Sequence, residues 1–220
     1  MLAAIETTGD SCAVALFDKD QLLVEFSADL ERSHDRLLGT FFRDMLRTAG
    51  VEPGDVEAVA VSVGPGSYTG IRIGASFAIG FAVAQNIPVV PVSTLDAIAW
   101  GGRSIGTIGG RTRVLSLIPD RRGGVYAALY EIQPDFNRLT APYNLPVDQL
   151  PPLLDENVFA VGPGAGMLGE AFAHCISPET EFLRAVAVGE YGFQLYRKGV
   201  SVAPEQVEPL YISGVTSARK

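Results

Sequence analysis

The stretch from residue 63 to residue 74, VGPGSYTGIRIG, is where this sequence comes nearest to a phosphate-binding motif. A phosphate cradle needs backbone N–H groups that converge at the start of a helix, usually with a lysine nearby. Here Pro65 removes one donor, no lysine is present, and Arg72 lies about one turn inside the predicted helix. The glycines are therefore interpreted as packing residues and not as phosphate ligands.

The sequence offers little for catalysis or metal binding by histidine. It has two histidines, His34 and His174, and they lie at the ends of different predicted helices. His34 follows Ser33, a predicted helix cap, where a positive ring would oppose the helix dipole. We therefore expect a neutral, hydrogen-bonding His34, with a role in a subunit interface as the alternative. No Ser-His-Asp triad, CxxC zinc pair or P-loop is found, so we predict no catalytic residue and no metal site.

Composition and charge narrow the possible classes of protein. With 220 residues, 47% of them hydrophobic and 19% charged, the chain is globular. The formal net charge of −8 argues against a stand-alone nucleic-acid binder, so any RNA would be held mostly by another protein. No apolar run is long enough for a bilayer and no basic leader is present, so we expect a cytoplasmic protein without membrane contact. Cys12 and Cys175 are expected to be buried, reduced thiols.

The apolar patterns predict which elements position these residues. Three strands at 2–8, 12–18 and 22–28 precede a helix from His34 to Ala49, which Ser33 caps and Gly50 closes. A strand, a helix ending near residue 85, another strand and a short helix follow, at 56–63, 68–85, 87–92 and 93–101. This order is typical of a ribonuclease-H-like lobe.

The pattern then begins again, with a strand hairpin at 113–132 and a strand, GPG turn and helix at 157–175. The two GPG turns start 98 residues apart, at Gly64 and Gly162. We predict an α/β protein of two tandem ribonuclease-H-like lobes, 1–103 and 104–220, with a glycine-rich linker at 101–110. The second lobe is less regular, with a last helix near 189–199 and a tail that returns to the first lobe. Coincidence is the alternative, because GPG is a common turn.

The helices at 34–49 and 68–85 carry more apolar surface than one sheet contact requires. The second is apolar or small nearly all round, and its glycines at 70, 74 and 80 each cost about 1 kcal/mol relative to alanine. Such helices suggest a subunit interface in which they form a four-helix bundle with a partner, or complete burial between the sheet and the other lobe. The candidate interface residues are His34, Leu38, Phe41, Phe42, Met45, Tyr68, Ile71, Ile73 and Phe77.

Six segments, in order, resemble the bacterial TsaB family of the actin, hexokinase and Hsp70 superfamily: IETT, SHDRLL, VGPGSYTGIRIG, NIPVVPVSTLDAIA, IPDRRGGVYAALYE and EPLYISG. The resemblance covers nearly the whole chain. TsaB proteins are subunits of the machinery that makes threonylcarbamoyladenosine in tRNA. The resemblance implies that the two apolar helices pair with a second copy or with TsaD, the catalytic paralogue.

TsaD-like proteins carry a metal-binding HxxxH pair, whose positions are occupied here by Thr94 and Ile98. The resemblance therefore implies a non-catalytic chain. In the superfamily the first hairpin of each lobe wraps a phosphate, and acidic residues there help to hold magnesium. Glu6, Asp120 and Arg121 are the candidates for a remnant of such a ligand site, and Pro119 stands where TsaB-like sequences usually have aspartate.

The function that the resemblance implies is a scaffold or activator. It would dimerise with TsaD and allow transfer of threonylcarbamoyl from threonylcarbamoyl-adenylate to the adenosine beside the anticodon. An ATPase of the TsaE kind would bind the assembled pair, and the chain alone would homodimerise. We expect no cofactor, with a nucleotide at a subunit boundary as the alternative. The competing functions are a nucleotide phosphotransferase or ATPase of the same superfamily and a metallopeptidase-like enzyme.

Overall fold

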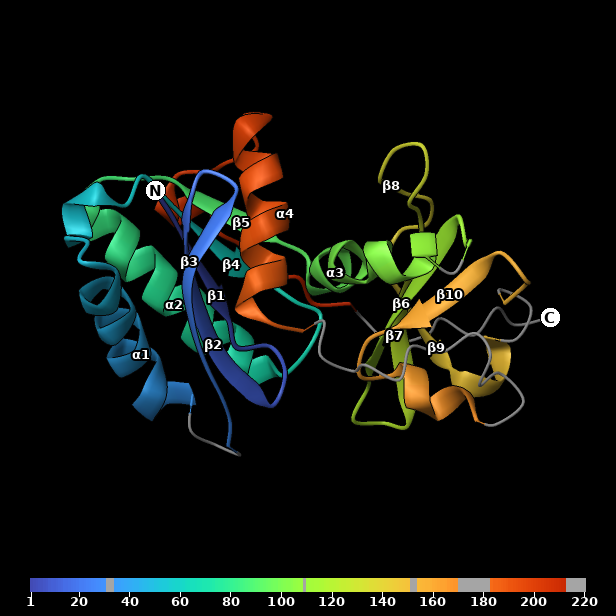
Figure 1. Ribbon diagram of the computed structural model, residues 1–220. Helices are drawn as coiled ribbons and strands as arrows, with labels where there is room; N and C mark the ends of the chain where they lie inside the picture. The colour runs from blue at the N-terminus through green and yellow to red at the C-terminus, as the bar shows by residue number, and fades with distance from the viewer. Residues whose placement is uncertain (31–33, 109, 151–153, 170–182, 213–220) are drawn as a thin grey trace. The chain divides into compact units, whose positions relative to one another are not determined.

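The computed structural model describes residues 1–30, 34–108, 110–150, 154–169 and 183–212 (Figure 1). The chain divides into two compact units. The first comprises Met1–Ala97 with Leu183–Leu210, and the second comprises Ile98–Phe182 with Tyr211–Lys220. The sequence prediction divides the chain at residue 103 and returns only the tail, whereas here the returning segment starts at Leu183.

The first unit is built on a five-stranded sheet in the order β3-β2-β1-β4-β5. β1, β2 and β3 form an antiparallel meander, and β4 and β5 continue the sheet in parallel with β1. The carboxyl ends of β1 and β4 therefore meet at one edge of the sheet, next to the glycine turn. The strands are β1 (Leu2–Glu6), β2 (Ser11–Asp18), β3 (Gln21–Asp29), β4 (Ala58–Ser62) and β5 (Val89–Val92).

Helices cover both faces of this sheet, which is why every residue of β1 is buried. Ala3 and Ile5 pack into a core with α1 (His34–Ala49) and α2 (Tyr68–Gln85), whereas Leu2 and Ala4 pack into a core with α4 (Ala185–Arg197). Alternate residues of a strand point to opposite faces, so one strand serves two cores. Figure 1 shows α1 and α2 on one side of the sheet and α4 on the other.

The second unit has a sheet in the order β10-β6-β7-β8, with β9 paired to β7. β6 pairs antiparallel with β7 and parallel with β10, as β1 pairs with β2 and β4 in the first unit. The second lobe thus repeats the first around its GPG turn, as the sequence predicts. The strands are β6 (Arg113–Pro119), β7 (Gly124–Glu131), β8 (Asn137–Arg138), β9 (Tyr143–Pro146) and β10 (Val158–Val161).

The glycine-rich segment predicted as a linker is instead helical, because α3 runs from Thr94 to Ile108. Its glycines have a packing role: a Cβ at Gly102 would lie 2.8 Å from the side chain of Val161 in β10. The helix predicted after Gly162 is seen only as the short turn η4 (Ala165–Leu168), and the rest of that prediction lies outside the described residues. The other 3-10 turns within the described residues are η1 (Pro53–Asp55), η2 (Val147–Gln149) and η6 (Pro204–Gln206).

The returning segment completes the first unit. After α4 the chain returns along the sheet, where Val202 pairs with Val89 and the Leu210 N–H donates to the Val63 carbonyl at 2.7 Å. No helix within the described ranges is both long and apolar enough to span a membrane.

Candidate subunit-interaction site

Helices α1 and α2 lie side by side, and aromatic rings join them. The Phe42 ring centroid is 5.1 Å from that of Phe77 and 4.7 Å from that of Phe81. Phe42 is buried, whereas Phe77 and Phe81 are half-buried. The outward sides of the two helices therefore form one continuous surface, which we call the α1–α2 face.

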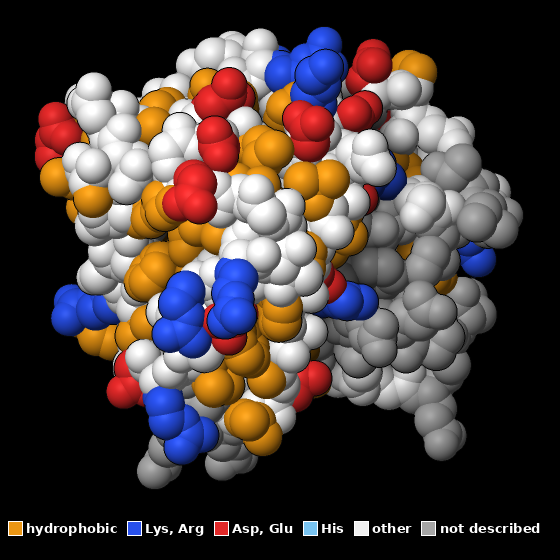
Figure 2. Space-filling view, turned by 60° about the vertical axis from the view of Figure 1, so that its left-hand side comes forward, with side chains coloured by type: hydrophobic (Ala, Val, Ile, Leu, Met, Phe, Trp, Pro, Cys, Tyr) orange, Lys and Arg blue, Asp and Glu red, His pale blue; other side chains and the backbone are white. Residues whose placement is uncertain are grey.

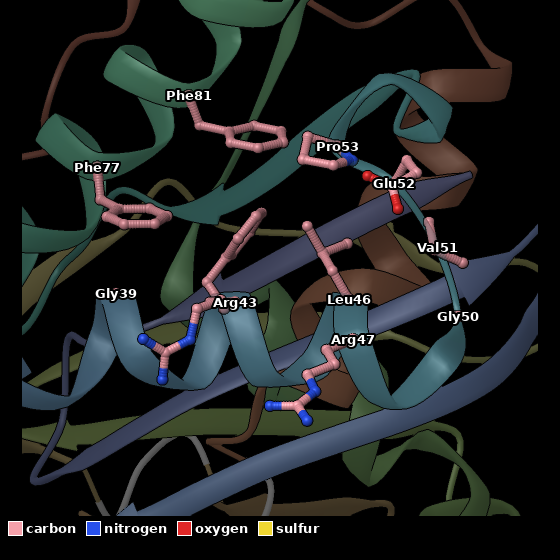
Figure 3. Close-up of a pocket in the computed structure, with 11 residues that line it drawn as sticks. Gly39, Arg43, Leu46, Arg47, Gly50, Val51, Glu52, Pro53, Phe77 and Phe81 are labelled. Carbon is pink, nitrogen blue, oxygen red and sulfur yellow. The ribbon is translucent and has the colours of Figure 1, made fainter.

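A groove of about 510 Å³ lies in this face, where α1, α2 and the chain from Gly50 to Pro53 meet. Figure 3 shows Phe77 and Phe81 pointing from α2 toward α1, with Arg43 and Arg47 on the α1 side. The groove thus has an apolar floor and a charged border. The residues that line this α1–α2 groove are Gly39, Phe42, Arg43, Leu46, Arg47, Gly50, Val51, Glu52, Pro53, Phe77 and Phe81.

The outward side of α2 is exposed and includes a position without a side chain, Gly80. Val83 is 63% exposed and Tyr68 is 51% exposed, with the Arg72 guanidinium stacked 4.1 Å from the Tyr68 ring centroid. A Cβ at Gly80 would meet nothing within 4 Å. Small residues on a helix surface let a second helix approach closely, so this side of α2 suits helix packing. Figure 2 shows hydrophobic side chains exposed over this side of the first unit, with Lys and Arg among them.

The predicted interface residues separate into two groups. Four of them are at most 3% exposed and belong to the chain's own core, so they mainly position the face: Leu38, Phe42, Met45 and Ile71. Of these four, Phe42 also lines the groove. His34, Phe41, Ile73 and Phe77 are half-buried, and Tyr68 is exposed. The sequence reading missed Phe81 and Val83, although the helical repeat that selected Phe77 also leads to Phe81.

His34 fixes the start of α1 to the first hairpin. Its Nε2 lies 3.1 Å from the Gly9 carbonyl oxygen and 3.2 Å from the Ser11 carbonyl oxygen. Both neighbours are acceptors, so Nε2 carries a proton and donates. This is the hydrogen-bonding role that the sequence predicts, and it ties α1 to the β1–β2 turn.

Three N–H groups around the start of α2 donate hydrogen bonds within the chain. The Ser67 N–H donates to the Thr8 carbonyl at 2.7 Å, the Gly70 N–H to the Ser67 hydroxyl at 3.3 Å, and the Ile71 N–H to the Ser67 carbonyl at 2.9 Å. A phosphate at this turn would have to displace these bonds. The glycine turn therefore holds α2 against β1, in agreement with the packing interpretation.

Comparison with known proteins relates these features to a family. A family model described as TsaD, tRNA N6-adenosine threonylcarbamoyltransferase, matches residues 28–141. The tRNA threonylcarbamoyladenosine biosynthesis protein TsaB of Escherichia coli K12 is 30% identical over 239 aligned positions, which cover 100% of this chain and 97% of that protein. The chain belongs to the TsaB family. A role in tRNA threonylcarbamoyladenosine biosynthesis follows from that membership.

Solved structures agree with the TsaB assignment. YeaZ from Pseudomonas aeruginosa is 28% identical with a TM-score of 0.80, covering 96% of this chain and 99% of that one. The activator of 2-hydroxyisocaproyl-CoA dehydratase from Clostridium difficile is 8% identical with a TM-score of 0.54, covering 96% of this chain and 99% of that one. The second likeness shows the fold alone. The chain has the α/β fold that these two solved structures share.

Glu6, a candidate remnant ligand residue, is fully buried at the end of β1. Its Oε1 accepts hydrogen bonds from the Thr8 N–H at 2.5 Å and the Thr8 hydroxyl at 2.6 Å. Its Oε2 has no hydrogen-bond partner among the described residues. Burial raises the pKa of this carboxyl, and the Thr8 hydrogen bonds oppose the rise. Within the described ranges no three His, Cys, Asp or Glu side chains gather into a metal-binding group.

Asp120, the corresponding candidate in the second unit, is fixed by its own hairpin. Its carboxylate accepts from the Asn144 amide at 3.0 Å and from the Tyr126 hydroxyl at 3.4 Å. Burial, followed by the charge of Asp120, raises the pKa of Tyr126. Arg121 is exposed at the turn. Asp120 therefore orders the β6–β7 hairpin against β9.

Proposed function

We propose that this chain is a non-catalytic subunit that binds a TsaD-type threonylcarbamoyltransferase through the α1–α2 face. The transferase carries the threonylcarbamoyl group from threonylcarbamoyl-adenylate to the adenosine beside the anticodon. This chain acts by covering helical surface of its partner and holding the partner in its active arrangement. Membership of the TsaB family supports the choice of partner.

The open α1–α2 face is the observation that carries the proposal. The face contains one exposed apolar side chain, Val83, and four half-buried ones: Phe41, Ile73, Phe77 and Phe81. Covering apolar surface contributes roughly 25 cal/mol per Å², so a partner helix that covers these side chains gains affinity from each of them. An amphipathic helix can bind such a surface by laying its apolar side in the groove.

The same face serves two competing pairings. Alone, the chain pairs with a second copy, and the transferase displaces that copy when it binds. A TsaE-type ATPase then binds the assembled pair. The tRNA is held mainly by the other subunits, because the chain carries a net charge of −8.

Gly80→Gln tests the pairing without disturbing the fold, because a side chain at Gly80 enters open space. We expect the variant to fold as the wild type does and to lose most of its co-purification with the transferase of the same genome. Gly166→Gln is the matched control, since a Cβ there also meets nothing within 4 Å and the residue lies in the second unit. Size-exclusion chromatography with and without the transferase gives the readout. Wild-type chain that never shifts with the transferase contradicts the proposed function.

A further inference from the structure

Arginines border the α1–α2 groove in a chain whose overall charge is negative. Arg36, Arg43 and Arg47 are exposed and spaced by seven and four residues along α1, which places them on one side of the helix. Arg43 and Arg47 line the groove itself. Opposite them, α2 contains one charged residue, Arg72, and no Asp or Glu.

Three acidic residues, Asp35 and Asp44 on α1 and Glu52 in the groove lining, offset part of this charge. Asp44 pairs with Arg43 at 3.0 Å, yet the Arg43 side chain stays 70% exposed. Arg47 makes no ion pair with any described residue, and Glu52 lines the groove beside Pro53 (Figure 3). The border formed by α1 and α2 is thus positive, above a floor of Phe42, Leu46, Phe77 and Phe81 that is apolar.

We propose that the arginine border selects the occupant of the groove: an amphipathic helix of the transferase whose acidic side chains face Arg43 and Arg47, in preference to a second copy of this chain. This inference rests on the proposed function and adds to it the chemistry of the partner. Complementary charge at the border steers the encounter and suppresses partners that carry like charge.

A second copy is the poorer fit because a two-fold interface brings the same patch to both sides. Where α1 of one copy packs on α2 of the other, its arginines meet a helix that offers Arg72 and no carboxylate. Self-pairing therefore buries apolar surface against like charge, and pairing with an acidic helix buries it against opposite charge. An RNA backbone matches the arginines but leaves the phenylalanine floor uncovered, so the groove favours a helix.

Added salt should change the affinities of the two pairings in opposite directions. Screening weakens the attraction between opposite charges in the transferase complex and reduces the repulsion between like charges in the self-pair. The dissociation constants of the transferase complex and of the self-pair are measured by analytical ultracentrifugation from about 50 mM to about 500 mM NaCl. The full-length chain and the transferase of the same genome are used. We expect the complex with the transferase to weaken at least about five-fold over this range, while the self-pair does not weaken.

The double variant Arg43→Gln/Arg47→Gln isolates the border. We expect it to weaken the transferase complex at least about five-fold at low salt, to remove most of its salt dependence, and to leave the self-pair as tight or tighter. Arg122→Gln/Lys198→Gln is the matched control, since it removes the same charge at exposed positions outside α1, α2 and the groove lining. The control separates the border from the general repulsion between acidic chains.

The outcomes distinguish the two proposals. No complex with the transferase at any salt concentration overturns the proposed function and this inference together. A complex that forms, but whose affinity responds equally to the border variant and the control, overturns this inference alone. Retention of tRNA by the isolated chain that depends on Arg43 and Arg47 also overturns it, because the border would then serve an RNA.

Discussion

The Thr7 hydroxyl donates to the Gly70 carbonyl at 2.7 Å, and the Thr7 backbone lies so close to Gly70 that a Cβ there would overlap its carbonyl oxygen. Gly74, one turn later, faces the same threonine side chain. The end of β1 therefore packs directly on the backbone of α2. Two of the three glycines inside the helix are explained by this contact, and the third, Gly80, faces outward.

Gly70→Ala and Gly80→Ala should change stability in opposite directions. The first forces a methyl group into the Thr7 backbone and should cost about 2 kcal/mol or more. The second adds a methyl group in open space and removes a helix-interior glycine, which should stabilise the chain by about 1 kcal/mol. Urea denaturation of the two variants and the wild type measures the difference. Equal effects at both sites would show that Thr7 does not confine α2.

The period of the apolar residues was enough to predict the two helices and their surplus of apolar surface, but not which apolar residues face the core. On α1, Leu38, Phe42, Met45 and Leu46 are buried, whereas Phe41 is half-buried although Met45, one turn later, is not. These residues have similar hydrophobicity, so only the position of the sheet decides which of them are covered.

Glycine composition misled the prediction of α3, because a glycine-rich stretch usually indicates a linker. Gly102 instead lies against the side chain of Val161. The two residues are almost sixty positions apart in the sequence. The return of α4 to the first sheet is equally non-local. Its glycines Gly189 and Gly192 pack on Phe17 and Ala60. Local patterns cannot reveal such pairings, because they say nothing about which distant segment lies alongside.

Glu25 should stabilise the start of α4 from the neighbouring strand β3. The helix has no side-chain cap of its own, and the Glu25 carboxylate accepts from the Val186 N–H at 3.2 Å while it pairs with Arg184. A carboxylate at a helix N-terminus satisfies a free donor and interacts favourably with the helix dipole. Glu25→Ala should therefore cost about 1–2 kcal/mol in thermal or urea denaturation. Glu57→Ala, at a pair whose carboxylate is 71% exposed, is the control and should change stability little. If both variants lose the same stability, Glu25 does not act as a cap.

Cys12 should be unreactive while the chain is folded. Burial, followed by the nearby Glu6 carboxyl, raises the pKa of its thiol to about 11. At pH 8 roughly one molecule in a thousand then carries the reactive thiolate. We expect alkylation of Cys12 to be at least about a hundred-fold slower in buffer than in urea, as followed by mass spectrometry of its peptide. Cys175 lies outside the described residues, so a Cys175→Ser variant keeps the measurement specific. Equal labelling rates in the two solvents would contradict the buried thiol.

The Glu6 carboxyl should make the folded state less stable as pH rises above 4.5, the ordinary pKa of the group. Because burial raises its pKa in the folded state, its contribution is fully present below the unfolded pKa and is lost as pH rises through the folded pKa. The side-chain amide of the Glu6→Gln variant cannot ionise, so the variant's free energy of unfolding should fall less steeply with pH. The variant should therefore become more stable relative to the wild type as pH approaches 8. Urea denaturation from about pH 4.5 to about pH 8 measures both curves. For the control Glu205→Gln, at an exposed position, the curve of stability against pH should run parallel to that of the wild type. Parallel curves for Glu6→Gln and the wild type would show that the carboxyl ionises in the folded chain as readily as in water, which its full burial beside Thr8 opposes.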